Sequence, residues 1–147
     1  MTIQPYTQYN AAEILPLYES VGWVFYYKHP EAVEKAYANS LCTLAAYEDG
    51  KPVGLIRAVG DGQTIVFIQD LLVYPEYQRR GIGKYILSVV EAMAKERGIS
   101  TVGIHTTEDN TAARGLYTWA GYTVTEIGPC TTADGVDRVG YTFQKQL

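Results

Sequence analysis

Two Asp-Gly pairs divide the early part of the chain into three apolar runs. The runs cover residues 41–47, 53–59 and 64–73, and the pairs between them are Asp49-Gly50 and Asp61-Gly62. Asp-Gly between apolar runs is the strongest short-range signal for a β-hairpin, because both residues tolerate the positive φ values of the tightest turns. The pairs therefore predict an antiparallel meander of three strands.

The hydrophobic pattern changes after residue 80. Apolar residues then recur at helical spacing as far as Gly98, where such a helix would end; they are Ile82, Ile86, Val89, Val90 and Met93. Strands are predicted next at 101–106, 122–127 and 139–143, with a helix at 111–119 that Gly121 closes. This order indicates a mixed α/β sheet covered by helices.

The residues before the meander read as two helices. Asn10 and Glu13 form a capping pair for a helix at 11–20, inside which the missing N–H of Pro16 favours a kink. Pro30 suits the first position of a second helix at 30–38. The predicted sheet is therefore preceded by a helical segment.

A glycine-containing loop lies between a predicted strand and a predicted helix, and it reads Gln78-Arg79-Arg80-Gly81-Ile82-Gly83-Lys84. Glycines let the backbone approach a ligand closely, and the free amides at a helix start favour an anion. Arg79, Arg80 and Lys84 add positive charge. The loop predicts a phosphate or pyrophosphate site, and the alternative is a tight turn with solvated arginines.

Two common phosphate motifs do not fit this loop. A P-loop requires Gly-x-x-x-x-Gly-Lys-Ser/Thr, but Gln78 stands at the first glycine position and Tyr85 replaces the hydroxyl residue. A dinucleotide fingerprint requires a third glycine where Ile86 stands. A phosphate site in this loop must therefore use another arrangement.

A second motif lies on the helix predicted at 111–119. Asn110, Ala113 and Tyr117 share one face of that helix, with Asn110 as its cap and Tyr117 two turns further in. Each residue also has an ordinary structural explanation, since Asn commonly caps helices and a helical Tyr commonly packs its ring. The information lies in the combination of the two motifs.

Together, the two motifs resemble the GNAT superfamily of N-acetyltransferases. They read Val73-Tyr74-Pro75-x-Tyr77-Gln78-x-x-Gly81-Ile82-Gly83 and Asn110-x-x-Ala113-x-x-Leu116-Tyr117-x-x-x-Gly121-Tyr122. Their order and separation are those of the superfamily, and the resemblance covers residues 41–127 well and the preceding residues in outline. The segment Ile68-Gln69-Asp70-Leu71 is also somewhat similar to the glucosamine-phosphate acetyltransferase branch.

The resemblance implies a single GNAT-like domain over residues 1–147, with a central, mostly antiparallel sheet whose middle strands splay, flanked by about four helices. It implies acetyl-CoA as cosubstrate and no metal. The pantetheine arm would fill the splayed gap like an added strand, and a backbone amide of Leu72 or Val73 would polarise the thioester carbonyl. The implied coenzyme-binding residues are Leu71, Leu72, Val73, Gln78, Arg79, Arg80, Gly81, Ile82, Gly83, Lys84, Asn110 and Tyr117.

The implied chemistry is direct attack of a neutral amine on the thioester. Tyr117 occupies the position that the superfamily uses for the general acid, and a phenol with a pKa of about 10 can protonate a thiolate whose own pKa is about 8.5. Many members carry a glutamate near the end of the strand before the Asn motif, where His105 stands here. His105 and Asp70 are the two candidate bases, and water alone is the third alternative.

The acceptor side is implied to lie on the N-terminal helices. Trp23, Tyr26 and Tyr27 are the candidate substrate-binding residues, because an aromatic wall can pack on an amine or a ring. The alternative is that these rings belong to the core or to a dimer contact. The polar stretch 131–137 between the last two strands is expected to close the pocket.

The composition of the chain limits the classes of partner and the location that we predict. The formal net charge is −4, and the only dense basic cluster is the one in the glycine loop, so we predict no nucleic-acid partner. Neither a signal peptide nor a membrane-spanning apolar stretch is evident, and Cys42 and Cys130 have no metal or disulfide spacing, so we predict a soluble cytoplasmic protein. Dimers are common among members of the superfamily, so the resemblance is compatible with a homodimer.

Three functions remain open. The leading one is an N-acetyltransferase that acetylates a small-molecule amine, such as an amino sugar. The second is an acetyltransferase for a peptide N-terminus or a lysine. The third, of another class, is a module that senses acetyl-CoA without turnover, and the presence of Tyr117 argues against it.

Overall fold

The computed structural model describes residues 1–132 and 135–147. The described residues form a mixed sheet with the strand order β1-β2-β3-β4-β5-β7-β6. The strands are β1 (Thr2–Pro5), β2 (Cys42–Glu48), β3 (Lys51–Gly60), β4 (Ile65–Val73), β5 (Thr101–Thr107), β6 (Thr123–Thr131) and β7 (Asp137–Gln146). The helices are α1 (Ala11–Ser20), α2 (Val24–Lys28), α3 (Pro30–Ala38), α4 (Ile82–Glu96) and α5 (Thr111–Trp119), with a 3-10 turn at Pro75–Tyr77.

The predicted elements are confirmed, several of them with the predicted bounds. The helices α1, α3 and α5 begin and end where the sequence places them, and Asn10 accepts a hydrogen bond from the amide of Ala12 as the cap of α1. The meander is antiparallel, and β4 with β5 is the one parallel pair among the described strands. The sheet is therefore the mixed, mostly antiparallel one that was expected.

Two short elements were missed. Strand β1 has only four residues and ends in a proline, and it exists because it pairs with β2. Helix α2 has five residues and no side-chain cap, and a helix this short is marginal by itself. Both form through tertiary contacts, and α2 brings the number of described α-helices to five instead of about four.

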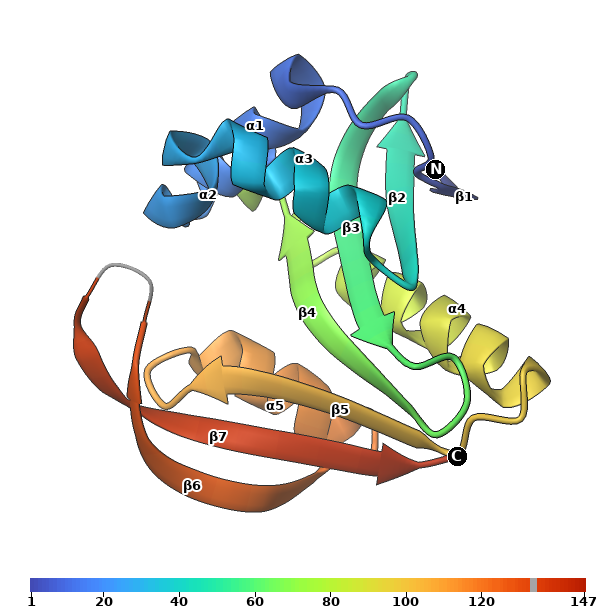
Figure 1. Cartoon of the computed structure of the whole chain (residues 1–147), viewed down its shortest axis with the longest axis vertical. Helices are drawn as coiled ribbons and strands as arrows, with labels where there is room; N and C mark the ends of the chain where they lie inside the picture. Colours follow the sequence, from blue (N-terminus) through green and yellow to red (C-terminus); the bar gives the residue numbers. More distant parts are fainter. Residues whose placement is uncertain (133–134) are drawn as a thin grey trace.

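Helices cover both faces of the sheet. On one face, Arg57 of β3 reaches Ser40, which follows α3, and Asp70 of β4 contacts Tyr18 of α1. On the other face, a Cβ added to Gly54 of β3 would touch Ile82 at 3.2 Å, so α4 packs there. Figure 1 shows α1, α2 and α3 in front of the sheet, with α4 and α5 behind it.

The middle of the sheet opens between β4 and β5. Their parallel pairing runs only from Ile65 opposite Thr101 to Ile68 opposite Ile104, and Figure 1 shows the two strands diverging from there. The β3–β4 register passes from Ala58 opposite Ile68 to Arg57 opposite Asp70, so Gln69 is the extra residue of a β-bulge. Bulges bend a strand, and this one lies where β4 leaves β5.

Buried tyrosines make alkaline stability a testable property of this fold. Burial raises the pKa of Tyr18, Tyr37 and Tyr122 above the value of about 10 for an exposed tyrosine. Below that value both the folded and the unfolded chain hold neutral phenols, and above it only the unfolded chain ionises freely. We expect Tm to fall steeply above about pH 10, measured by circular dichroism melts between pH 8 and 11.

A control for this prediction is Tyr122→Phe, which removes one raised pKa and should make Tm fall less steeply with pH. Absorbance at 295 nm should show the buried tyrosines ionising together with unfolding. Independent ionisation of all 13 tyrosines near pH 10, without unfolding, would contradict the prediction.

Among the described residues, no helix is both long and apolar enough to cross a membrane.

Candidate active site

A cavity of about 620 Å³ lies beside the opening between β4 and β5. It is lined by the turn from α1 into α2, by the part of β4 before the bulge, by the end of β5 and by residues beside the tip of the β6–β7 hairpin. The volume falls in the range of small-molecule sites. Its lining residues are Val21, Gly22, Trp23, Val24, Phe25, Tyr26, Phe67, Ile68, Gln69, His105, Thr106, Thr107, Asp109, Asn110, Thr132 and Arg138.

The cavity unites some of the residues predicted from sequence and leaves others out. Trp23, Tyr26, His105 and Asn110 line it, although they come from three separate segments of the chain. Tyr27 does not line it. Asp70, Tyr117 and the glycine loop do not belong to its lining. Residues 133 and 134 of the predicted closing stretch lie outside the described residues.

The exposed edge of β4 suits an extended chain of amides. Beyond Ile68, β4 keeps its pairing with β3 through Val73 but has no pairing with β5. The carbonyl of Val73 accepts a hydrogen bond from the side-chain amide of Gln78 at 2.9 Å, which ties the glycine loop to the end of this edge. Backbone groups along such an edge hydrogen-bond an added strand, so Leu71, Leu72 and Val73 fit the implied pantetheine arm.

The glycine loop has the features of an anion site. Gly81 caps α4 with φ of 82°, and no side chain of the described residues caps the first amides of the helix. Arg79 takes a positive φ of 64°, and Arg79, Arg80 and Lys84 are exposed. A Cβ on Gly83 would touch Leu116 of α5 at 3.4 Å, so the start of α4 packs against α5. These residues fit a pyrophosphate.

Tyr117 lies in the apolar layer between α5 and the sheet. It is 5% exposed, and its ring packs on Phe143 and Tyr122. Its hydroxyl is not among the fully buried polar atoms without a hydrogen-bond partner, a class that in the described residues holds the Tyr9 hydroxyl. Burial of the side chain raises the pKa of Tyr117, so the phenol remains protonated at neutral pH. A protonated phenol can donate its proton to a leaving group.

His105 and Tyr117 approach β5 from opposite faces. Tyr117 packs on Phe143, which stands opposite Ile104 in the β5–β7 register, whereas His105 is the next residue and stands opposite Thr142. Successive side chains of a strand point to opposite faces. The His105 ring lies over Gly140, beside the thiol of Cys130. The two side chains therefore lie on opposite faces of the sheet, and only His105 lines the cavity.

The contact between His105 and Gly140 yields a prediction. A Cβ on residue 140 would collide with Nε2 of His105 and lie 2.9 Å from its Cε1, so Gly140→Ala must displace the imidazole. Because His105 is exposed and can rotate, the free energy of unfolding should change by less than about 1 kcal/mol. The imidazole resonances of His105 in NMR spectra should shift.

Gly128→Ala is the matched control, because a Cβ there would meet nothing within 4 Å. It should leave both the unfolding free energy and the His105 resonances unchanged. Unchanged His105 resonances in Gly140→Ala would show that the ring does not occupy this position.

Asp70 lies in a buried polar network under the helices. Its carboxylate accepts hydrogen bonds from the hydroxyls of Tyr18 at 2.7 Å and Tyr26 at 2.9 Å, and it pairs with Nε of Arg57 at 2.5 Å. Asp70 has no exposed surface. Burial alone would lower the pKa of Arg57, but the Asp70 charge outweighs it and raises that pKa. A carboxylate held by three donors is poorly placed to collect a proton from a substrate.

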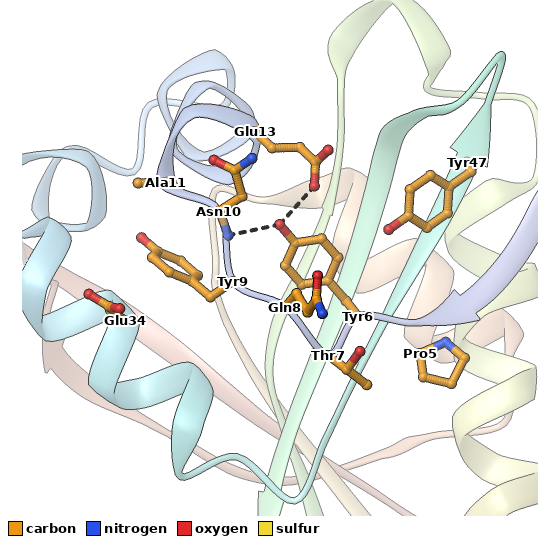
Figure 2. A pocket seen from close by; sticks show the side chains of 10 residues that line it. All are labelled: Pro5, Tyr6, Thr7, Gln8, Tyr9, Asn10, Ala11, Glu13, Glu34 and Tyr47. Atoms are coloured by element: carbon orange, nitrogen blue, oxygen red, sulfur yellow. Dashed lines mark hydrogen bonds between the residues drawn. The ribbon is translucent and has the colours of Figure 1, made fainter.

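A second hollow, of about 660 Å³, surrounds the chain before α1 (Figure 2). Its lining contains none of the site residues predicted from sequence. In Figure 2 the hydroxyl of Tyr6 lies between Asn10 and Glu13, donating to the Glu13 carboxylate at 2.8 Å and accepting from the Asn10 amide. The hydroxyl of Tyr9 is buried without a hydrogen-bond partner among the described residues. This hollow lies apart from the candidate active site.

The sequence reasoning missed several residues of the cavity. Gln69 is exposed at the bulge and lines the cavity, but its role depends on a bulge that no sequence pattern announced. Asp109 immediately precedes Asn110 in the sequence, so the second motif could have indicated it. Arg138 of β7 pairs with Asp109 at 2.9 Å, a contact between segments far apart in the chain.

Among the described residues, no group of three or more His, Cys, Asp or Glu side chains is placed to hold a metal ion.

Comparison with known proteins places these features in context. The family described as "Acetyltransferase (GNAT) family" matches residues 10–122. An uncharacterized N-acetyltransferase of the ycf52-like type from Prochlorococcus marinus is 33% identical over 61% of this chain and 51% of its own length. The chain spans about half the length of the curated relatives it matches first.

Solved structures share the fold. A GNAT family acetyltransferase from Elizabethkingia anophelis, solved with acetyl-CoA bound, has a TM-score of 0.73 at 20% identity over 99% of this chain and 97% of that one. The aminoglycoside 6'-N-acetyltransferase from Enterococcus faecium has a TM-score of 0.79 at 20% identity, with the same coverage. At these identities the likeness concerns the fold alone.

Proposed function

Because this chain belongs to the GNAT family of acetyltransferases, we propose that it transfers an acetyl group from acetyl-CoA to the primary amine of a small molecule. The observation that carries the proposal is the opening of the sheet at Gln69, where β4 leaves β5 and then leads into the glycine loop and the start of α4. Helix α5, which carries Tyr117, packs against that start through Leu116.

The coenzyme is placed by three parts of the chain. Backbone groups of Leu71, Leu72 and Val73 hold the amide-containing arm as an added strand. The amides from residue 79 to residue 84 hold the pyrophosphate, supported by the positive charges of the loop. The side-chain oxygen of Asn110 is used by the amide of Ala113, so its NH₂ group remains as the donor to the coenzyme.

The reaction is a single displacement. The neutral amine attacks the thioester carbonyl, a new C–N bond forms, and the C–S bond breaks with release of the thiolate. Tyr117 donates its proton to the departing sulfur, and its raised pKa keeps that proton in place before the reaction. The nitrogen loses a further proton as the amide forms, and that proton passes through water to restore the Tyr117 phenol. A backbone amide of Leu72 or Val73 stabilises the charge that develops on the carbonyl oxygen.

The amine must lose a proton, because an alkylamine with a pKa of about 10 is mostly protonated at neutral pH. His105 lines the acceptor cavity and is exposed to water, so it is our candidate to accept this proton, directly or through water. For Asp70 we propose a supporting role in place of the base role, since its carboxylate is occupied by Arg57, Tyr18 and Tyr26.

The experiment is a thiol-release assay with acetyl-CoA and a panel of primary amines and peptides, with the acetylated product identified by mass spectrometry. Thiol release that depends on a small amine supports the proposal. Turnover with peptides alone would replace it with a protein acetyltransferase. Tight binding of acetyl-CoA without transfer to any acceptor would replace it with a sensor module.

A further inference from the structure

Aromatic side chains dominate one wall of the acceptor cavity. Trp23 and Tyr26 meet edge-to-face with their ring centroids 5.4 Å apart, and Phe25 packs on Tyr26 at 6.1 Å. Phe67 of β4 lines the same cavity. Rings arranged in this way offer apolar surface together with negative faces, which bind an aromatic body and attract an ammonium group.

The described lining residues of the cavity carry little negative charge. Among its described lining residues, Asp109 is the only carboxylate, and it pairs with Arg138, whose guanidinium Nη1 lies 2.9 Å from it. A hydrogen bond from Thr107, followed by the Arg138 charge, lowers the pKa of Asp109, so this carboxylate stays ionised and paired. A ligand with several ammonium groups needs several carboxylates to replace the water it loses.

The aromatic wall is fixed in position. The Tyr26 hydroxyl donates to Asp70, which Arg57 and Tyr18 hold from other elements of the fold. Burial and the Asp70 charge raise the pKa of Tyr26 to about 12, so the phenol remains a donor throughout the physiological range. A wall that is already ordered loses little conformational entropy when a ligand binds. Asp70 therefore acts on the acceptor through Tyr26, as a positioning residue.

From these observations we infer that the acceptor is a primary monoamine with an aromatic body, and not a polycationic amino sugar. The inference rests on the proposed acetyl transfer and specifies its substrate class. The single ammonium group arrives over the aromatic rings and loses its proton near His105, while the body of the molecule packs against Trp23 and Tyr26.

The test compares kcat/KM, corrected for the fraction of free amine, for three probes: 2-phenylethylamine, n-butylamine and kanamycin. The phenyl ring buries apolar surface and makes aromatic contacts worth together more than 1.4 kcal/mol, so 2-phenylethylamine should be preferred over both others by at least about tenfold. A preference for kanamycin would overturn the inference and leave the proposed function standing.

Two substitutions test binding at the aromatic wall separately from the acetyl transfer. Tyr26→Phe keeps the ring but loses its hydrogen bond to Asp70, so KM for 2-phenylethylamine should rise about fivefold while KM for acetyl-CoA stays unchanged. Tyr9→Phe is the matched control, because it removes a hydroxyl that has no hydrogen-bond partner among the described residues and lies outside the cavity. An unchanged KM for 2-phenylethylamine in Tyr26→Phe would overturn the role of the fixed wall.

A binding measurement keeps the inference testable without turnover. If no amine releases thiol from acetyl-CoA, the proposed function fails. Titration calorimetry then measures directly whether the cavity binds an aromatic monoamine. With coenzyme A present, 2-phenylethylamine should bind at least about tenfold more tightly than n-butylamine or kanamycin. Equal or weaker binding of 2-phenylethylamine would overturn the inference.

Discussion

Replacing Tyr117 by phenylalanine is expected to lower kcat for acetyl transfer by about a hundredfold or more, the usual contribution of a positioned general acid. The thiolate would then leave without a proton donor at hand. Stability should change little, since the substitution keeps the ring and its contacts with Tyr122 and Phe143. Stopped-flow or steady-state thiol release measures the rate, and urea unfolding measures the stability.

The pH dependence gives this prediction a second readout. Because burial raises the pKa of Tyr117, the wild-type enzyme should keep its proton donor, and hence its kcat, as pH rises to about 10. Tyr122→Phe is the matched control: it removes another buried hydroxyl, which donates to Glu91 at 3.3 Å outside the candidate site, and it should leave kcat nearly unchanged. Full activity of Tyr117→Phe across the pH range would rule out its role as the acid.

Replacing Asp70 by alanine is expected to lower the free energy of unfolding by about 3–5 kcal/mol. The substitution leaves the guanidinium of Arg57 buried without its partner and removes the acceptor for the hydroxyls of Tyr18 and Tyr26. Breaking a buried ion pair on one side is costly because the remaining charge has lost both water and partner. Urea unfolding followed by circular dichroism measures the change.

The double variant Arg57→Met/Asp70→Leu is the control for this reading. It removes both charges, so part of the lost stability should return, although the tyrosine hydroxyls still lack their acceptor. A loss below about 1 kcal/mol in Asp70→Ala would show that the network does not support the fold. Asp70→Asn, measured below its melting temperature, addresses the base prediction: a changed pH profile of kcat would favour a proton-accepting role over a positioning one.

Local chemistry determined most of the secondary structure. The Asp-Gly pairs fix the turns of the meander, and the cap residues Asn10 and Asn110 mark the starts of α1 and α5, because a cap or a tight turn depends on neighbouring residues alone. The order and spacing of the two motifs indicated the GNAT family, and the family match confirms it. These features can be read from the sequence since each involves groups a few residues apart.

Only the tertiary structure decided where the chemistry lies. The bulge at Gln69 arises from the pairing of two whole strands, the burial of Asp70 depends on helices some 50 residues away, and Arg138 enters the cavity through an ion pair with Asp109. The same holds for α2, a five-residue helix that packs on α1 and α3 and carries Tyr26, whose hydroxyl donates to Asp70 of β4. Strand register, burial and long-range ion pairs depend on the whole packed chain, and no local pattern encodes them.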